Sequence, residues 1–329
     1  MLINEHPFAA YIRALGKGKK GSRSLAREEA RVAFAMVLRG EAEPVQVGAF
    51  LMLLRVKEES ADELAGFVEA VREFIAHPSG IQVDLDWSSY AGKRKHLPWF
   101  ILAALLLAET GVRVYMHGSA GHTSGRIYTE GCFASLNLPV AQTWQEVDAA
   151  LNQQNICFHP LQHWCEPLQK LIDLRSSFGL RSPVHTLTRL VNPLAAPCSL
   201  QSIFHPAYAE NHQQAAFLLN QKNALVIKGE GGEFERRPDA SCKLYLLQER
   251  EKSLEEWPRY FDAPQAAEEL MEPQGLRAMW RGESNETYAE AAIIGTAALV
   301  LRALQKTQNQ TDAYVLATQC WQARNLDRI

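Results

Sequence analysis

The sequence predicts an α/β protein in which a small all-helical N-terminal domain precedes a larger domain built on a mostly parallel central sheet surrounded by helices. Helical periodicity alone fills the first 77 residues, and short apolar strands alternate with helices after that point. Of the 329 residues, 47% are hydrophobic and 22% are charged, which is typical of a globular chain with a large core.

Four amphipathic helices are indicated in the N-terminal domain by apolar residues spaced three or four apart. Ser24, Pro44 and Ser60 carry helix-start signals, and Gly40 ends the second helix. We therefore assign residues 1–77 to a helical domain. Residues 165–190 have a helical pattern again, and we expect them to return to this domain.

The remaining segments, residues 78–164 and 191–329, are expected to form the α/β domain. Its expected strands cover residues 83–87, 112–117, 156–158 and 224–228, and its clearest helices cover 98–110 and 288–304. Ligands of parallel sheets bind beyond the carboxyl ends of the strands. We therefore expect an anion-binding cleft there, at the hinge between the two domains.

Composition excludes several classes of function. The formal net charge is −3, so any anion-binding role must come from a local basic face. The longest apolar run, residues 97–108, contains Pro98 and is too short to cross a bilayer, and the N-terminal stretch lacks signal-peptide features. Six scattered cysteines indicate reduced thiols. These features favour a cytoplasmic protein without a membrane partner or zinc.

Residues 40–57, continued by residues 63–67, resemble the helical-domain signature of anthranilate phosphoribosyltransferases, which are members of glycosyltransferase family three. Further agreement lies at residues 117–118, 178–182, 192–193, 229–235 and 288–292. The resemblance implies the two-domain fold, a phosphate and substrate cleft at the hinge, and a homodimer formed through the helical domain.

The departures from that family lie in its phosphate-binding elements. The enzymes hold a diphosphate on the bare amides of a glycine-rich loop, and a nearby acid organises magnesium. The corresponding stretch here, residues 88–95, ends in Lys93-Arg94-Lys95. The metal pair of the family falls on Phe234 and Glu235, and phenylalanine cannot ligate magnesium.

We therefore expect no cofactor, with magnesium at Glu233 and Glu235 only if transferase activity persists. The stretch Gly229–Glu233 is interpreted as a plain turn. No catalytic residue is assigned. The residual phosphoribosyl diphosphate-like site would comprise Gly92, His117, Gly118, Ser119, Thr123 and Ser124.

The loop and the segment Val184–Arg189 are also similar to the YbiB-type relatives, a group associated with nucleic-acid binding rather than tryptophan synthesis. The candidate anion-binding residues are Lys93, Arg94, Lys95, Arg175, Arg181, Arg189, Lys17, Lys19 and Lys20. The alternatives are a solvated turn for the triplet, an exposed interhelix loop for residues 17–20, and structural salt bridges for the arginines.

The leading hypothesis is a homodimer, non-catalytic or cryptically catalytic, that binds nucleic acid with little sequence preference. Tyr90, Trp99 and His117 are candidates to stack unpaired bases, which would favour single strands; the alternatives are a core position for Trp99 and a structural turn for His117. The second hypothesis is an active phosphoribosyltransferase that uses anthranilate or a related aromatic acceptor in tryptophan biosynthesis. A nucleoside phosphorylase is disfavoured because the Lys-x-Ser pattern of those enzymes is absent from the loop.

Overall fold

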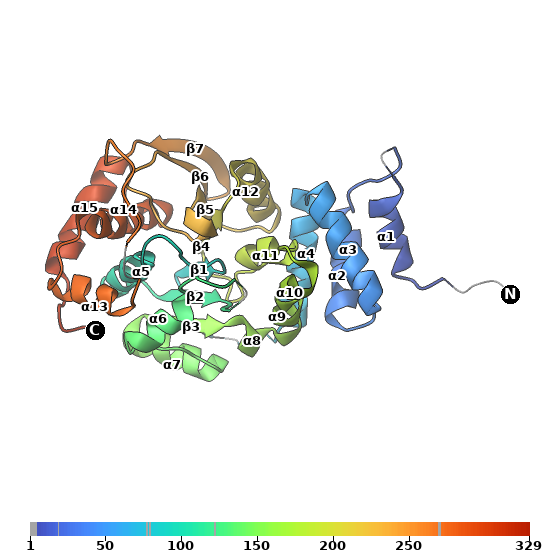
Figure 1. The fold of residues 1–329 in the computed structure, drawn as a ribbon, viewed down its shortest axis with the longest axis horizontal. Helices are drawn as coiled ribbons and strands as arrows, with labels where there is room; N and C mark the ends of the chain where they lie inside the picture. Colours follow the sequence, from blue (N-terminus) through green and yellow to red (C-terminus); the bar gives the residue numbers. More distant parts are fainter. Residues whose placement is uncertain (1–4, 19, 77, 79, 122, 269–270) are drawn as a thin grey trace.

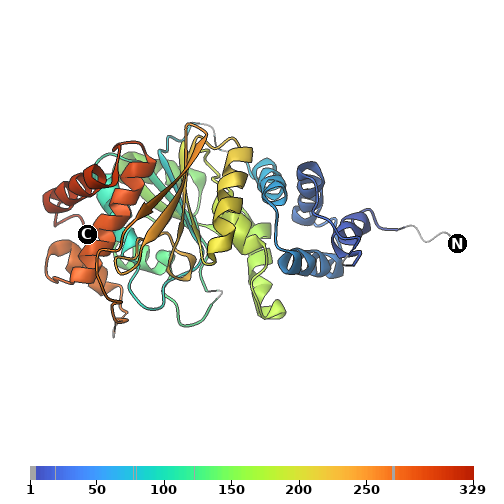
Figure 2. The same ribbon diagram turned by 90° about the horizontal axis from the view of Figure 1, so that it is seen from above.

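A computed structural model describes residues 5–18, 20–76, 78, 80–121, 123–268 and 271–329. The helices of the N-terminal part lie at one end of an elongated molecule, and the sheet with its covering helices forms the larger part (Figure 1). The same division is visible after rotation of the view (Figure 2). The predicted fold class is confirmed.

The N-terminal part consists of α1 (Ala9–Gly16), α2 (Arg27–Leu38), α3 (Pro44–Lys57) and α4 (Ala61–Phe74). Helix α4 begins with a capping box: the Ser60 hydroxyl accepts a hydrogen bond from the Glu63 amide, and the Glu63 carboxylate accepts one from the Ser60 amide. Helices α2 and α4 pack closely, since a Cβ at Gly66 would lie 2.2 Å from the Arg27 carbonyl oxygen. Glycine is therefore required at that position.

A second group of short helices packs against the same apolar core. It comprises α8 (Leu161–Trp164), α9 (Glu166–Asp173), α10 (Arg175–Phe178), α11 (Val184–Leu187) and the 3-10 turn η1 (Thr188–Leu190). Their buried residues Leu168, Ile172, Val184 and Leu187 belong to one cluster with the apolar residues of α1–α4. The turn η1, which carries Arg189, also contacts strands β1 (Leu85–Ser89) and β4 (Cys198–Ile203) of the sheet.

The central sheet has seven strands in the order β3-β2-β1-β4-β5-β6-β7. The first five in this order are parallel, and β6 and β7 continue the sheet as an antiparallel hairpin. Most residues of β7 are exposed and several are charged, whereas Trp257 at its end is buried. The strands are β1 (Leu85–Ser89), β2 (Val114–Gly118), β3 (Ile156–Pro160), β4 (Cys198–Ile203), β5 (Asn223–Lys228), β6 (Cys242–Gln248) and β7 (Glu251–Trp257).

Helices cover both faces of the sheet. Helices α5 (Phe100–Glu109), α13 (Gln274–Arg281), α14 (Thr287–Ala303) and α15 (Gln310–Ala323) lie on the side remote from α1–α4, and α12 (Ala209–Leu218) lies between the sheet and α4 (Figure 2). Helix α5 is buried on nearly every side, as its unbroken apolar sequence predicts. The remaining elements are α6 (Thr129–Ser135), α7 (Trp144–Gln154), η2 (Pro206–Tyr208) and η3 (Glu230–Gly232).

Within the described part of the chain, none of the helices combines the length and the apolar character needed to cross a membrane. The carboxyl ends of β1, β2, β4 and β5 meet at one edge of the sheet, because these strands are parallel. The loops that leave this edge carry most of the predicted site residues.

Candidate functional site

The loops after β1 and β2 approach each other closely at the carboxyl edge. A Cβ at Gly118 would lie 1.9 Å from the Ser89 carbonyl oxygen, so glycine is required at the end of β2. Lys93 and Ile127 exchange two backbone hydrogen bonds of 2.8 and 2.9 Å. The Arg126 guanidinium donates to the Ala91 and Gly92 carbonyl oxygens at 3.0 and 2.9 Å. These hydrogen bonds hold the loop after β1 in place.

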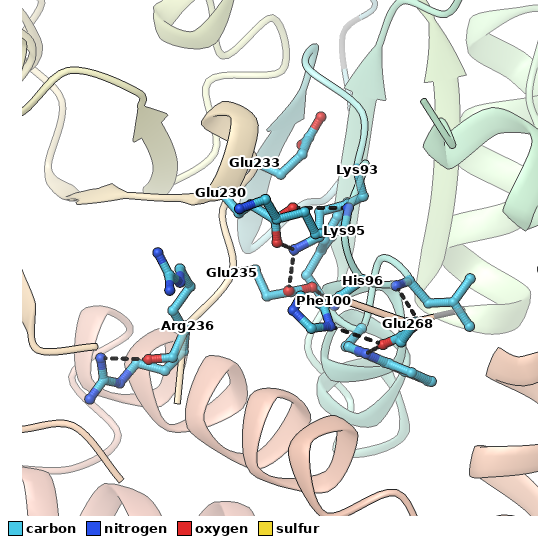
Figure 3. Close-up of polar contacts among 12 residues, drawn as sticks. Lys93, Lys95, His96, Phe100, Glu230, Glu233, Glu235, Arg236 and Glu268 are labelled. Atoms are coloured by element: carbon cyan, nitrogen blue, oxygen red, sulfur yellow. Dashed lines mark hydrogen bonds and ion pairs between the residues drawn. The ribbon is translucent and has the colours of Figure 1, made fainter. Parts of the chain in front are cut away.

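Lys93 lies inside the protein, 1% exposed, between two carboxylates (Figure 3). Its Nζ atom is 2.9 Å from Glu230 and 2.5 Å from Glu235. Burial by itself lowers the pKa of Lys93, but the two carboxylates outweigh burial and raise the pKa above its usual value. The expectation that Lys93 binds an anion together with Arg94 and Lys95 is therefore wrong, because its charge is neutralised within the fold.

Glu233 occupies the amide groups of the same loop. Its Oε1 atom accepts hydrogen bonds from the Ala91 and Gly92 amides at 2.6 and 2.5 Å, and the residue is fully buried. Gly92 has φ +68°, and a Cβ there would meet Ile127 and Tyr128 at 3.0 Å. Burial raises the pKa of Glu233, and the two amide hydrogen bonds counteract that rise. The expectation of a plain turn at Gly229–Glu233 is therefore incomplete, since its acids bind the neighbouring loop.

Four arginines lie close enough to interact electrostatically beside this loop: Arg126, Arg175, Arg181 and Arg189. Burial, and then repulsion by the other three, lowers the pKa of Arg181 to about 10. Arg175 donates to the Thr123 hydroxyl at 2.5 Å, and Arg189, 8% exposed, donates to the His185 carbonyl oxygen at 2.5 Å. Within the described residues, no carboxylate lies within 4.0 Å of Arg181, so this cluster concentrates positive charge.

Arg94 and Lys95 are exposed, unlike Lys93, and they line a cavity of about 810 Å³ over the ends of β4 and β5. Lys228 at the end of β5 and Lys243 on β6 line the same cavity. Across the described ranges, none of these four cations has a carboxylate oxygen within 4.0 Å. Of these four cations, the sequence pattern predicted Arg94 and Lys95 as anion-binding residues but not Lys228 and Lys243.

The three aromatic candidates for base stacking are buried. Tyr90 and His117 are 0% exposed and Trp99 is 3% exposed, so none of them offers a face to a ligand. His117 lies 2.7 Å from the Tyr90 hydroxyl through Nδ1 and 3.2 Å from Asp86 through Nε2. The stacking hypothesis is wrong for these residues, because Tyr90 and His117 instead form a polar chain in the core and Trp99 packs within it.

The other predicted residues are dispersed. Lys17 and Lys20 are exposed on the loop after α1, at the end of the molecule remote from the sheet (Figure 1), so they do not join the arginine cluster. Lys19 lies outside the described residues. Ser119 is buried, and Ser124 is exposed on the turn that follows. Glu235 accepts from Lys93 and from the Phe100 amide at 2.9 Å, so both residues proposed for magnesium are engaged by protein donors.

Sequence reasoning missed Arg126, Glu230, Lys228 and Lys243 as residues of this edge. Lys228 and Glu230 carried a usable signal, because Lys228 ends a predicted parallel strand and Glu230 follows it directly. Arg126 and Lys243 carried none, since the first follows an irregular loop and the second lies on a strand that was not predicted.

The chain thus combines a helical bundle with an α/β domain that carries basic loops at the carboxyl edge of its sheet. Matching family models describe residues 9–75 as the helical bundle domain and residues 101–322 as the a/b domain of the glycosyl transferase family. The chain belongs to this family.

The chain is also similar in sequence to individual proteins of known sequence over most of its length. The uncharacterized protein YbiB of Escherichia coli is 31% identical over 242 residues, which cover 72% of this chain and 75% of that protein. Anthranilate phosphoribosyltransferase of Methylorubrum extorquens is 30% identical over 212 residues, covering 63% of this chain and 62% of the relative.

Solved structures show the same fold. Anthranilate phosphoribosyltransferase from Thermus thermophilus superposes with a TM-score of 0.75 at 19% identity, covering 94% of both chains. The Saccharomyces cerevisiae enzyme in complex with PRPP and Mg gives 0.77 at 15% identity, covering 98% of this chain and 96% of that one.

Proposed function

We propose that this protein binds nucleic acid, with single strands favoured and little sequence preference, at a basic cleft that Arg94, Lys95 and Arg126 line and that the neighbouring arginines Arg175, Arg181 and Arg189 extend. The observation that carries the proposal is the gathering of Arg126, Arg175, Arg181 and Arg189 beside the loop, where within the described residues no carboxylate lies within 4.0 Å of Arg181. Besides burial, repulsion by the other three arginines lowers the pKa of Arg181 to about 10, and a bound polyanion would offset that repulsion. Clusters of arginine are suited to phosphate because the guanidinium binds it in a bidentate manner.

The hydrogen bonds of the loop after β1 disfavour the binding of a magnesium diphosphate at this loop. A diphosphate on magnesium needs free loop amides and free acidic ligands. Here Glu233 already accepts the Ala91 and Gly92 amides, and Lys93 already pairs with Glu235. Phe234 offers no oxygen ligand. These residues do not fit a magnesium diphosphate, so we propose that this part of the ancestral site is closed.

Salt dependence of binding tests the proposal. Titrate a fluorescein-labelled single-stranded oligonucleotide with the wild type and with the double variant Arg94→Gln/Lys95→Gln at several salt concentrations. Counterion release predicts that the log–log slope falls by about 0.7 for each phosphate that the variant no longer neutralises. The charge-matched control Arg259→Gln/Lys306→Gln removes two exposed cations outside the basic cleft. The proposal is refuted if the wild type does not bind, or if both double variants bind alike.

An active phosphoribosyltransferase is the second candidate, and one observation favours it. The chain belongs to the glycosyl transferase family, and residues 178–182, which include Arg181, are among the segments that resemble the anthranilate phosphoribosyltransferases. Calorimetry with phosphoribosyl diphosphate and magnesium, followed by a turnover assay with anthranilate, separates the two functions. Micromolar binding with turnover would establish the transferase in place of the closed site.

The partner expected in solution is a second copy of the chain, joined through the helical domain. Helix α3 carries an outward apolar stripe formed by Val45, Ala49 and Val56, and two of these are among the most exposed large hydrophobics, at 79% for Val45 and 85% for Val56. Positions four, seven and eleven residues apart share one helix face. Light scattering should show a dimer that Val45→Asp/Val56→Asp converts to a monomer; a wild-type monomer would refute the dimer.

We also propose a cytoplasmic location. Six free thiols, five of them buried, support a reducing compartment, because disulfides persist in oxidising ones. Cell fractionation with an antibody against the native protein tests this location, and recovery from an extracytoplasmic fraction would contradict it.

A further inference from the structure

The cavity over β4–β6 is lined by cationic side chains and by an aromatic side chain. Its lining includes seven Arg or Lys side chains and a single carboxylate, Glu230. That carboxylate is already paired with Lys93 at 2.9 Å and accepts the Lys95 amide at 3.2 Å. The cavity therefore carries a net positive charge that nothing in its own lining neutralises.

The cations of the cavity differ in how far the fold already engages them. Arg236 is buried and donates to the carbonyl oxygens of Ala240 and Pro258, and Arg237 pairs with Asp239 at 3.0 Å. Lys228 and Lys243 instead extend from adjacent strands and are exposed. Within the described residues neither has an ion-pair partner. Two such ammonium ions can form charge-assisted hydrogen bonds with the oxygens of a phosphate group.

An aromatic surface lies on the loop after β4. Phe204 is 55% exposed and lines the cavity, and His205 packs against its ring edge-to-face with a centroid separation of 4.8 Å. An exposed phenylalanine is unremarkable by itself, but here it lines a pocket that is rich in cations. Single-strand binding sites typically combine cations that contact the phosphates with aromatic rings on which the bases stack.

We propose that this cavity is a nucleotide subsite in which Lys228 and Lys243 hold phosphate and the Phe204 ring stacks on the base. The inference deepens the proposed function and rests on it for the source of the nucleotide, a single strand running past Arg94 and Lys95. The volume of about 810 Å³ lies within the range of roughly 300–1,000 Å³ that is usual for ligand pockets. A free nucleotide presents the same phosphate and base.

The base-stacking role of Phe204 is tested with two oligonucleotides of equal length, oligothymidylate and the same strand with abasic sites. The wild type should bind oligothymidylate at least about fivefold more tightly, because stacking on an aromatic residue contributes roughly 1–3 kcal/mol per base. Phe204→Ala should abolish this difference while leaving abasic binding unchanged. Phe204→Leu, which keeps apolar bulk without a ring, should behave like alanine. Tyr260→Ala, at an exposed tyrosine outside the cavity, should retain the difference.

The phosphate-binding role of the two lysines is tested with Lys228→Gln/Lys243→Gln. This variant should weaken both oligonucleotides equally and reduce the log–log salt slope by about 1.4, because two phosphates would no longer be neutralised. Direct calorimetry with thymidine 5′-monophosphate identifies the source: binding that Phe204→Ala abolishes shows that the subsite also takes a free nucleotide.

The failures are distinguishable. If no oligonucleotide binds, the proposed function fails, and the subsite then stands or falls with thymidine 5′-monophosphate. If oligonucleotides bind but Phe204→Ala keeps the full preference for thymidine over abasic sites, the subsite is refuted and the proposed function survives. A fold unchanged by circular dichroism in each variant is required for these comparisons, and the exposed positions of Phe204, Lys228 and Lys243 favour it.

Discussion

Lys93, Arg94 and Lys95 are adjacent in sequence but should respond very differently to the same substitution. Lys93→Met removes the cation that lies 2.9 Å from Glu230 and 2.5 Å from Glu235 and leaves Glu235 buried without a counter-charge. Breaking a buried ion pair from one side typically costs about 3–5 kcal/mol of unfolding free energy. The exposed neighbours, changed to Met, should each alter stability by less than about 0.5 kcal/mol.

Urea denaturation at pH 7 measures these differences, provided that fluorescence and circular dichroism give coincident transitions. A second substitution, Glu235→Gln, should restore part of the stability in the Lys93→Met background, since the amide oxygen can still accept from the Phe100 amide. A cost below about 1 kcal/mol for Lys93→Met, or an equal cost for Arg94→Met, would refute the assignment of Lys93 to the interior.

Three further substitutions probe the same molecule. Glu233→Ala strands two buried amides and should destabilise by about 2–6 kcal/mol in urea, whereas Glu233→Gln keeps an acceptor and should cost much less. Burial raises the pKa of Glu59 from its usual 4.5 to about 7. The folded state favours the protonated form of Glu59, so this contribution to stability is fully present below about pH 4.5 and is lost as the pH rises through 7. Glu59→Gln should therefore flatten the dependence of the unfolding free energy on pH and raise that free energy by roughly 3 kcal/mol at pH 8. Gly118→Ala forces a methyl group against Ser89 and should cost about 3 kcal/mol or more in thermal unfolding, whereas Gly131→Ala, which meets nothing within 4 Å in helix α6, should be neutral or stabilising.

Local patterns predicted the framework because they depend on neighbouring residues. The expected helix at 288–304 is Thr287–Ala303, and the expected strand at 224–228 is Asn223–Lys228. The strand expected at 83–87 begins two residues later, at Leu85, although Ile81 and Val83 continue the apolar pattern before it. Periodicity therefore gave the type of each element more accurately than its ends.

The β6–β7 hairpin and the interior of the candidate site lay beyond local patterns. Strand β7 contains Glu, Lys and Ser at exposed positions, so it lacks the alternation that indicates a half-buried strand. Lys93 looked like part of a basic triplet because its two carboxylate partners stand 137 and 142 residues further along the chain. Only the folded topology brings those charges together.

The charged hairpin also constrains how this protein meets its own copies. An outermost strand with free backbone groups invites another chain to extend the sheet, and lysine and glutamate at such a strand oppose this extension through repulsion and hydration. Glu251, Lys252, Glu255 and Glu256 occupy four of the seven positions of β7. At the opposite margin, Val140 already bridges to Phe158 of β3. Because both edges of the sheet disfavour pairing with another strand, crowding in the cell should not drive strand-to-strand polymerisation. Contacts between copies of the chain should therefore form through the helices.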